Sequence, residues 1–401
     1  MKSGWKTEPL GKLCEFQRGL TYAIGDEVGV SHNIVLRATN IDLGTNLLNF
    51  SELKYISDKV VVPESKKVRK GSLMICTASG SKSHLGKVAY IDKDYGYAFG
   101  GFMGMITPKN GLVARYLFHL MTSDAYKEFI GALADGTNIN NLRFDDLKNF
   151  PVPHPAYTQQ QRIVGILDEA FDAIGTAKAN TEKNLQNSRG LFESYLDSVF
   201  TQRGEGWVEK RLAEVSKEFG RGKSKHRPRN DPKLYGGEYP FIQTGDVRNS
   251  GHTITSYSQT YNEAGLAQSK LWPEGTLCIT IAANIAETGI LGFDACFPDS
   301  VIGVVPDESI TSSSFLEYEL RSFKSQLQAQ GKGSAQDNIN LGTFDDRLFA
   351  FPSLKVQRNI VSTLDGLREE TQHLESIYKQ KLAALEELKK SLLNQAFAGR
   401  L

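Results

Sequence analysis

The second half of this chain repeats the first, and no other feature restricts its possible folds as much. At an offset near 200 residues, Gly4-Trp5 recurs as Gly206-Trp207, and Phe144-Asp145-Asp146 recurs as Phe344-Asp345-Asp346. From Ile163 onward the offset is 197 residues and needs no gap to the end of the chain. Because the matches follow one another in order, the organisation is A–B–A′–B′, in which each A is a globular segment and each B a long helix.

The repeat predicts an α+β protein with two mixed α/β domains separated by two long antiparallel coiled-coil helices, arranged as a pseudo-two-fold tandem repeat. Short β-branched and aromatic runs between Gly- and Ser-rich turns indicate the strands of the A segments. We expect the domains at residues 1–154 and 206–352, and the helical spacers at 155–205 and 353–401.

Apolar residues recur every three or four positions along both B segments, which is typical of a coiled-coil seam. Each helix is expected to bury its stripe against the other. The predicted seam includes Ile163, Leu167, Ile174, Leu185, Leu191 and Tyr195 in the first helix and Ile360, Leu364, Leu374, Leu382, Leu388 and Leu392 in the second.

Composition excludes several classes of protein. The net charge is only +1, so any nucleic-acid contact must come from local clusters rather than from an overall positive charge. No apolar run reaches the roughly 18 residues of a membrane span. The four cysteines form no Cys-x-x-Cys pair and the seven histidines show no metal-ligand spacing, so we expect no metal site and a cytoplasmic location.

One basic cluster stands out in the second domain. Five Lys or Arg residues fall within nine positions, although residues 204–353 carry a net charge of −4. These residues are Arg221, Lys223, Lys225, Arg227 and Arg229. A solvated loop is the plain alternative, and a loop that contacts DNA phosphates or base edges is the functional one.

Other polar residues in turns are candidates for DNA contacts, although residues of this kind are also common in ordinary turns. The first domain offers Arg18, Tyr22, Arg37, Thr39 and Asn40, and the loop residues Ser81, Lys82 and Lys87. The second offers Gln243, Thr244 and Asp246 at the place equivalent to Arg37–Asn40, and Lys332 and Gln336 near the repeated Asn-Ile-Asn.

No catalytic constellation is evident in the sequence. The Gly/Ser loop fails as a Walker phosphate cradle because Gly80 to Gly86-Lys87 is one residue too long and Val88 follows the lysine. The chain also lacks an Asn-Pro-Pro-aromatic motif, which holds a flipped adenine for methylation. We therefore expect no catalytic residue.

The chain resembles the specificity subunits of Type I restriction–modification systems over nearly its whole length. The resemblance rests on the C-terminal run Leu388–Leu401, on Gln159–Val164, and on the segments Gln17–Tyr22, Leu36–Ile41, Phe241–Asp246 and Ala282–Asn284. It implies two target recognition domains, each reading half of a bipartite target in double-stranded DNA, and it adds Asn284 to the candidate contacts.

The resemblance also implies partners. These are two copies of a methyltransferase subunit, which would bind the S-adenosylmethionine that this chain lacks, and restriction subunits bound through them. Two alternatives stay open: a stand-alone bipartite DNA-binding regulator, and a methyltransferase with degenerate motifs.

Overall fold

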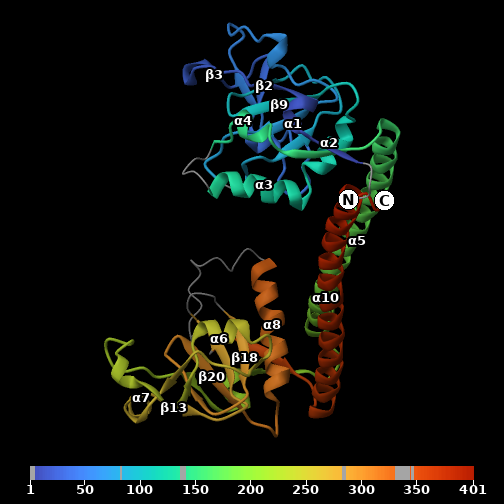
Figure 1. Ribbon diagram of the computed structural model, residues 1–401. Coiled ribbons are helices and arrows are strands. Elements are labelled where there is room, and N and C mark those ends of the chain that lie inside the picture. The colour runs from blue at the N-terminus through green and yellow to red at the C-terminus, as the bar shows by residue number, and fades with distance from the viewer. Residues whose placement is uncertain (1–4, 82–83, 136–140, 282–285, 330–343, 345–346) are drawn as a thin grey trace. The chain divides into compact units, whose positions relative to one another are not determined.

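The computed structural model describes residues 5–81, 84–135, 141–281, 286–329, 344 and 347–401. It contains two compact units, one formed by residues 1–182 with 380–401 and the other by residues 183–379. Each unit contains one A segment and part of both long helices, α5 (Tyr157–Thr201) and α10 (Leu354–Phe397) (Figure 1). The expected combination of mixed α/β domains with long helices is confirmed. No helix in the described part of the chain combines the length and apolar character of a membrane span.

Three small sheets build the domain of the first unit. Two of them have four strands, in the orders β2-β9-β6-β7 and β3-β5-β4-β8, and the third is the pair β1-β10. The strands are β1 (Lys6–Pro9), β2 (Cys14–Arg18), β3 (Glu27–Val28), β4 (Asn33–Leu36), β5 (Lys54–Ile56), β6 (Leu73–Cys76), β7 (Val88–Tyr90), β8 (Ala98–Phe99), β9 (Met103–Pro108) and β10 (Pro151–His154). The helices α1 (Leu10–Leu13), α2 (Ala114–Leu120), α3 (Asp124–Asp135) and α4 (Phe144–Leu147) complete this domain.

The second unit repeats this plan with its own strands. Its sheets have the orders β12-β20-β17-β18-β14, β15-β13-β19-β16 and β11-β21. The strands are β11 (Val208–Arg211), β12 (Ser216–Arg221), β13 (Tyr235–Phe241), β14 (Thr253–Ile254), β15 (Gln259–Tyr261), β16 (Leu271–Trp272), β17 (Leu277–Thr280), β18 (Thr288–Leu291), β19 (Ala295–Cys296), β20 (Val301–Pro306) and β21 (Leu348–Phe351). Its helices are α6 (Thr244–Asn249), α7 (Glu263–Ala267) and α8 (Ser313–Ala329).

The two long helices run antiparallel within each unit. In the first unit Lys178 Nζ lies 2.7 Å from Glu386 Oε1, and Lys389 lies over the ring of Phe171. In the second unit Arg189 Nε lies 3.2 Å from Glu375 Oε2. The order of these contacts is opposite on the two helices, as an antiparallel pair requires, and exposed ion pairs of this kind contribute little stability.

The buried face of the helices departs from the expected seam at four positions. Ile163, Leu167 and Leu364 are buried, but Leu374 is 36% exposed and Leu388, Leu191 and Tyr195 are also exposed. The buried residues after Ser188 are instead Phe192, Leu196 and Phe200. They pack in the core of the second domain with residues such as Phe315, so the end of α5 turns its apolar face to that domain rather than continuing the coiled coil.

One glutamine at the start of each helix ties the helix to its domain. The amide of Gln160 donates to the carbonyl oxygens of Gly111 and Pro155, at 2.9 Å each, and its Oε1 accepts from the backbone N–H of Val113. Gln357, its counterpart at the offset of 197, donates to Ile310 and Pro352, also at 2.9 Å. Both side chains are buried, so replacing either would leave buried backbone groups unpaired.

A second repeated contact lies two turns further along each helix. In the first unit Asp168 accepts from Arg115, and His119 Nε2 lies 2.7 Å from its Oδ1. Although burial opposes the shift, these hydrogen bonds hold the pKa of Asp168 below its usual value. In the second unit the hydroxyl of Tyr318 donates to Asp365 at 2.6 Å.

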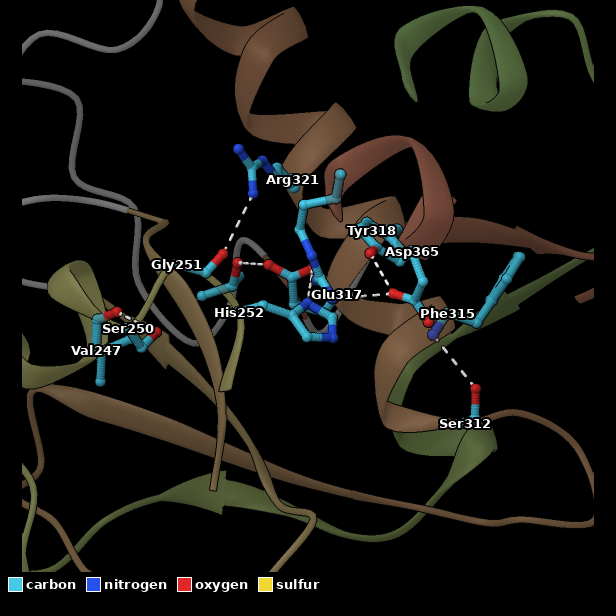
Figure 2. A network of polar contacts seen from close by, with 12 residues as sticks. Val247, Ser250, Gly251, His252, Ser312, Phe315, Glu317, Tyr318, Arg321 and Asp365 are labelled. Atoms are coloured by element: carbon cyan, nitrogen blue, oxygen red, sulfur yellow. Dashed lines mark hydrogen bonds and ion pairs between the residues drawn. The ribbon is translucent and has the colours of Figure 1, made fainter. Parts of the chain in front are cut away.

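Helix α8 is fixed to the sheet beside it by a polar network (Figure 2). His252 Nδ1 lies 3.0 Å from Oε2 of the buried Glu317, and Thr288 donates to Oε1 at 2.9 Å. Arg321 donates to Gly251 and to Glu193 of α5. These bonds connect strand β18, helix α8 and helix α5 in one unit.

A buried carboxyl group in α8 makes the stability of the second unit depend on pH. Glu319 is 5% exposed and accepts a 2.8 Å hydrogen bond from the backbone N–H of Ala350. Burial raises the pKa of this group from 4.5 to about 8. The folded chain therefore holds a proton that the unfolded chain releases, and the free energy of unfolding falls as the pH rises between these two values.

We predict that Glu319→Gln, which keeps the acceptor for Ala350, removes this pH dependence. The thermal midpoint of the variant should exceed that of the wild type at about pH 9, and the difference should shrink towards about pH 5. The exposed Glu274→Gln serves as the control and should show no such trend. An equal difference at both pH values would contradict the assignment.

Candidate nucleic-acid interface

The same backbone turn ends a parallel strand in both domains and carries the candidate contact residues. In the first domain β4 pairs in parallel with β8 and is followed by Arg37, whose backbone N–H donates to Asn40 Oδ1 at 2.8 Å. In the second, β13 pairs in parallel with β19 and leads to Gln243, whose N–H donates to Asp246 Oδ2 at 2.8 Å. The side chain of the third residue after Arg37 or Gln243 thus stabilises the turn. The side chains of Arg37 and Gln243 themselves have no capping role.

Two of the candidate contacts are used inside the turn itself. Asn40 is 1% exposed, and its amide donates to the carbonyl oxygens of Asn49 and Glu52, at 2.9 Å each. Asp246 accepts from Gln243 N–H, and Ser258 also lies within hydrogen-bonding distance of it. Asn40 and Asp246 thus support the backbone of the turn, and a contact of either residue with a base stays a prediction.

In the first domain, Arg37 belongs to a cluster with Tyr22, Glu27 and Lys54. The ammonium group of Lys54 pairs with the Glu27 carboxylate, and this hydrogen bond lowers the pKa of Glu27. The Tyr22 hydroxyl donates to the same carboxylate at 3.5 Å. Burial and the negative charge of Glu27 raise the pKa of Tyr22, against the influence of Arg37. Sequence reasoning missed Lys54, because nothing near it in the chain distinguishes it from other surface lysines.

Thr39 and Arg18 are the two remaining candidates in this part of the first domain. Thr39 is exposed in the turn after Arg37. The guanidinium carbon of Arg18 lies 5.8 Å from the ring centre of Phe144, a cation–π distance.

In the second domain, a pocket of about 450 Å³ lies beside the turn. Gln243 and Thr244 line it together with Arg229 and with Gln259 of β15, which the sequence did not indicate. Gln243 Nε2 donates to Gln259 Oε1 at 2.6 Å. The rings of Phe241 and Tyr261 are stacked with their centres 4.0 Å apart. Both rings line the same pocket, together with Tyr235 and several polar residues.

The basic cluster 221–229 forms an exposed segment whose members differ in their contacts. Arg227 donates to the carbonyl oxygens of Ser224 and His226, which braces the loop, and Arg229 lies 2.7 Å from Asp299. Arg221, Lys223 and Lys225 are exposed and make no ion pair within the described residues. These three are the ones whose charges are open to a phosphate.

The Gly/Ser loop of the first domain does not present all of its candidates to solvent. Lys87 is 8% exposed, and its Nζ donates to the carbonyl oxygen of Ile41 at 2.7 Å and lies 2.6 Å from Nδ1 of His84. Burial lowers the pKa of this lysine. Lys87 thus supports the fold from inside, and its contact with DNA stays a prediction. Ser81 is exposed.

Four candidates lie outside the described residues. They are Lys82, Asn284, Lys332 and Gln336. Among the described residues, no group of three or more His, Cys, Asp or Glu side chains is arranged to hold a metal ion.

Sequence comparison finds one family over most of the chain. A family model described as the Type I restriction modification DNA specificity domain matches residues 2–186 and again residues 204–387. Similar curated proteins include the Type I restriction enzyme StySPI specificity subunit of Salmonella potsdam and the EcoKI specificity subunit of Escherichia coli K12. Each is 24% identical over an alignment that covers 100% of this chain and 90% of the relative.

Solved structures share the fold. One, described as the structural basis of complex assembly and conformational transition of the type I R-M system, matches with a TM-score of 0.79 and 19% identity over 100% of this chain and 99% of that one. The HsdS subunit from Thermoanaerobacter tengcongensis matches with a TM-score of 0.66 and 19% identity, over 100% and 98% of the two chains.

The different environments of the five basic residues lead to a prediction about DNA binding. Replacing Arg221, Lys223 and Lys225 together by Gln should weaken DNA binding. The slope of log K against log salt should fall by about 0.9 for each phosphate that the variant no longer neutralises. Titrations of duplex DNA at several salt concentrations measure this slope.

The matched control replaces three other exposed basic residues, Lys59, Lys70 and Lys93 of the first domain, by Gln. We expect the control to keep most of the wild-type slope. If the slope falls equally in the two triple variants, the 221–225 segment is an ordinary solvated surface.

Proposed function

This chain belongs to the family of Type I restriction–modification DNA specificity domains, and we propose that it is the sequence-reading subunit of such a system. Each recognition domain would read one half of a bipartite DNA target, and the long helices would set the distance between the halves. The observation that carries this proposal is that one fold occurs twice with the same supported turn, while the half-buried side chain at the start of the turn differs, Arg37 in one domain and Gln243 in the other. We place the chain in the cytoplasm with its DNA.

If each recognition domain reads its half of the target independently, exchanging one domain has a predictable result. Replacing residues 206–352 by the corresponding domain of another family member should change one half of the modified DNA motif and leave the other intact, because the first domain has its own core and its own turn. Mapping of modified bases by long-read sequencing, after co-expression with the methyltransferase subunit, gives the motif.

The same mapping includes a variant with one extra heptad in each helix, placed opposite one another. Seven residues add roughly 10 Å, or about three base pairs. This variant should keep both half-sites with a longer gap, or lose activity because the second half-site is also turned around the duplex. Altered bases at the original spacing would contradict the proposal.

We further propose that two methyltransferase subunits dock on the helices, one on each unit. The support is a pair of exposed leucines at equivalent helix positions: Leu191 is 53% exposed in the second unit, and Leu388 is 47% exposed in the first. Exposed apolar side chains repeated in this way offer one kind of partner two near-equivalent surfaces. Restriction subunits would then attach through the methyltransferase subunits, which would also bring the S-adenosylmethionine.

Native mass spectrometry of the complex tests this docking. We expect one copy of this chain with two methyltransferase copies. Leu191→Arg or Leu388→Arg alone should reduce the complex to one methyltransferase copy, and the double variant should bind neither, since a buried unpaired charge is costly. Val61→Arg, at an 85% exposed position of the first domain, is the control and should keep both copies.

Two results would overturn the docking proposal or the role of the chain. Loss of both copies from either single variant, with the fold intact, would show that the leucines do not mark two separate surfaces. Binding of S-adenosylmethionine by the isolated chain would favour the alternative in which it is itself a methyltransferase.

A further inference from the structure

Two positions in the fold are equivalent in the two recognition domains but carry different hydrogen-bonding groups. The first position follows the parallel strand and is Arg37 in one domain and Gln243 in the other. The second lies on the neighbouring antiparallel strand. There Val35, two residues before Arg37, pairs with Lys54, while Phe241, two residues before Gln243, pairs with Gln259. The register of the sheets therefore makes Lys54 the counterpart of Gln259.

In the second domain these two positions form a coupled amide pair. The bond from Gln243 Nε2 to Gln259 Oε1 uses one donor and one acceptor. Neither side-chain amide makes another hydrogen bond to the described residues, so one carbonyl oxygen and one NH₂ group stay available side by side. The same holds if both amides are turned round, because the bond then consumes the other oxygen and the other NH₂ group.

A neighbouring donor and acceptor match one base in the major groove. The edge of adenine presents the N7 acceptor beside the N6 amino donor, whereas guanine presents two acceptors, cytosine one donor, and thymine one acceptor with a methyl group. Among single bases, only adenine engages both the free carbonyl oxygen and the free NH₂ group of the glutamine pair. The glutamine pair lies at the pocket that Arg229 and Thr244 also line. These two side chains offer a polar surface to a phosphate or base edge next to the adenine.

In the first domain the equivalent groups are donors. Arg37 carries five N–H donors, and its Nε is buried without a hydrogen-bond partner among the residues described. Lys54 keeps two of its three donors beyond its pairing with Glu27, whose carboxylate is in turn occupied by Lys54 and Tyr22. Two donor side chains are complementary to the O6 and N7 acceptors of guanine.

We propose that these two paired positions are the specificity-determining residues of their domains: Gln243 with Gln259 reads an adenine, and Arg37 with Lys54 reads a guanine. The inference rests on the proposed function, since it names the bases that the two proposed DNA-reading domains recognise. Because the turn and the strand register place both residue pairs at equivalent positions of their domains, one geometry serves two different bases.

The test uses the complete complex of this chain with its methyltransferase subunit. Mapping of the wild-type complex first gives the bipartite motif. Methylation rates are then measured on duplexes that carry each of the four bases at every specified position. Gln243→Met and Gln259→Met, which keep the length of the side chain and remove its hydrogen bonds, should each relax the same single position.

We expect that position to be an adenine, and discrimination against the other bases to fall roughly 5- to 150-fold, the range that corresponds to a bidentate base contact of about 1–3 kcal/mol. Arg37→Met should relax one guanine in the other half-site by a similar factor. Gln202→Met, at an exposed position after α5, makes the same chemical change away from the pocket and should leave every position unchanged.

The possible results separate this inference from the function on which it rests. If the wild-type complex modifies no bipartite motif, the proposed function fails. If it modifies one but the glutamine variants relax a base other than adenine, relax two different positions, or relax none while folding as the wild type does, only the inference is overturned. Thermal melting of each variant identifies misfolded chains, and for these Gln243→Asn and Gln259→Asn provide second variants with the same expected outcome.

Discussion

Neither long helix can bury its apolar face by itself, and this constraint organises the whole chain. Helix α5 contains Gly165, Gly175 and Gly190, where an added Cβ would meet open space, so each glycine costs about 1 kcal/mol relative to alanine with no packing reason to offset it. The helix depends instead on Ile163 and Leu167, which pack with the end of α10 and the first domain. Each unit is therefore completed by a helix from the other sequence repeat.

The repeat and its two kinds of segment could be predicted from the sequence, because apolar periodicity and ordered self-similarity survive the divergence of the two halves. The seam was wrong where tertiary packing takes over. Periodicity continued the stripe through Leu191, whereas the structure buries Phe192 and Leu196 against the second domain. A one-residue shift of this kind leaves the pattern of apolar residues almost unchanged, so the pattern alone cannot reveal it.

The sequence indicated the turn that carries candidate contacts, but it did not indicate how each of these side chains is used in the fold. The sequence located the turn at Arg37 and Gln243, yet it could not tell outward-facing side chains from those used inside, as Asn40 and Lys87 are. Lys54 and Gln259 were missed because strand register, which brings them next to the turn, is a long-range property. The buried Gln160 and Gln357 were overlooked for a related reason: each has one partner about 50 residues away in the chain, Gly111 or Ile310.

The way in which the turn is supported affects how such a protein can evolve. The side chain that stabilises the turn by a hydrogen bond comes from position 40 or 246, whereas the half-buried side chain at position 37 or 243 takes no part in that bond. Under the proposed function, stability and recognition are encoded by different codons of the same short segment. If positions 37 and 243 contact bases as proposed, a mutation there would alter what is recognised and keep the hydrogen bond that supports the turn, so a lineage could move between targets through folded intermediates. The two halves of this chain, which share the supporting bond and differ at positions 37 and 243, would be two end points of that kind of drift.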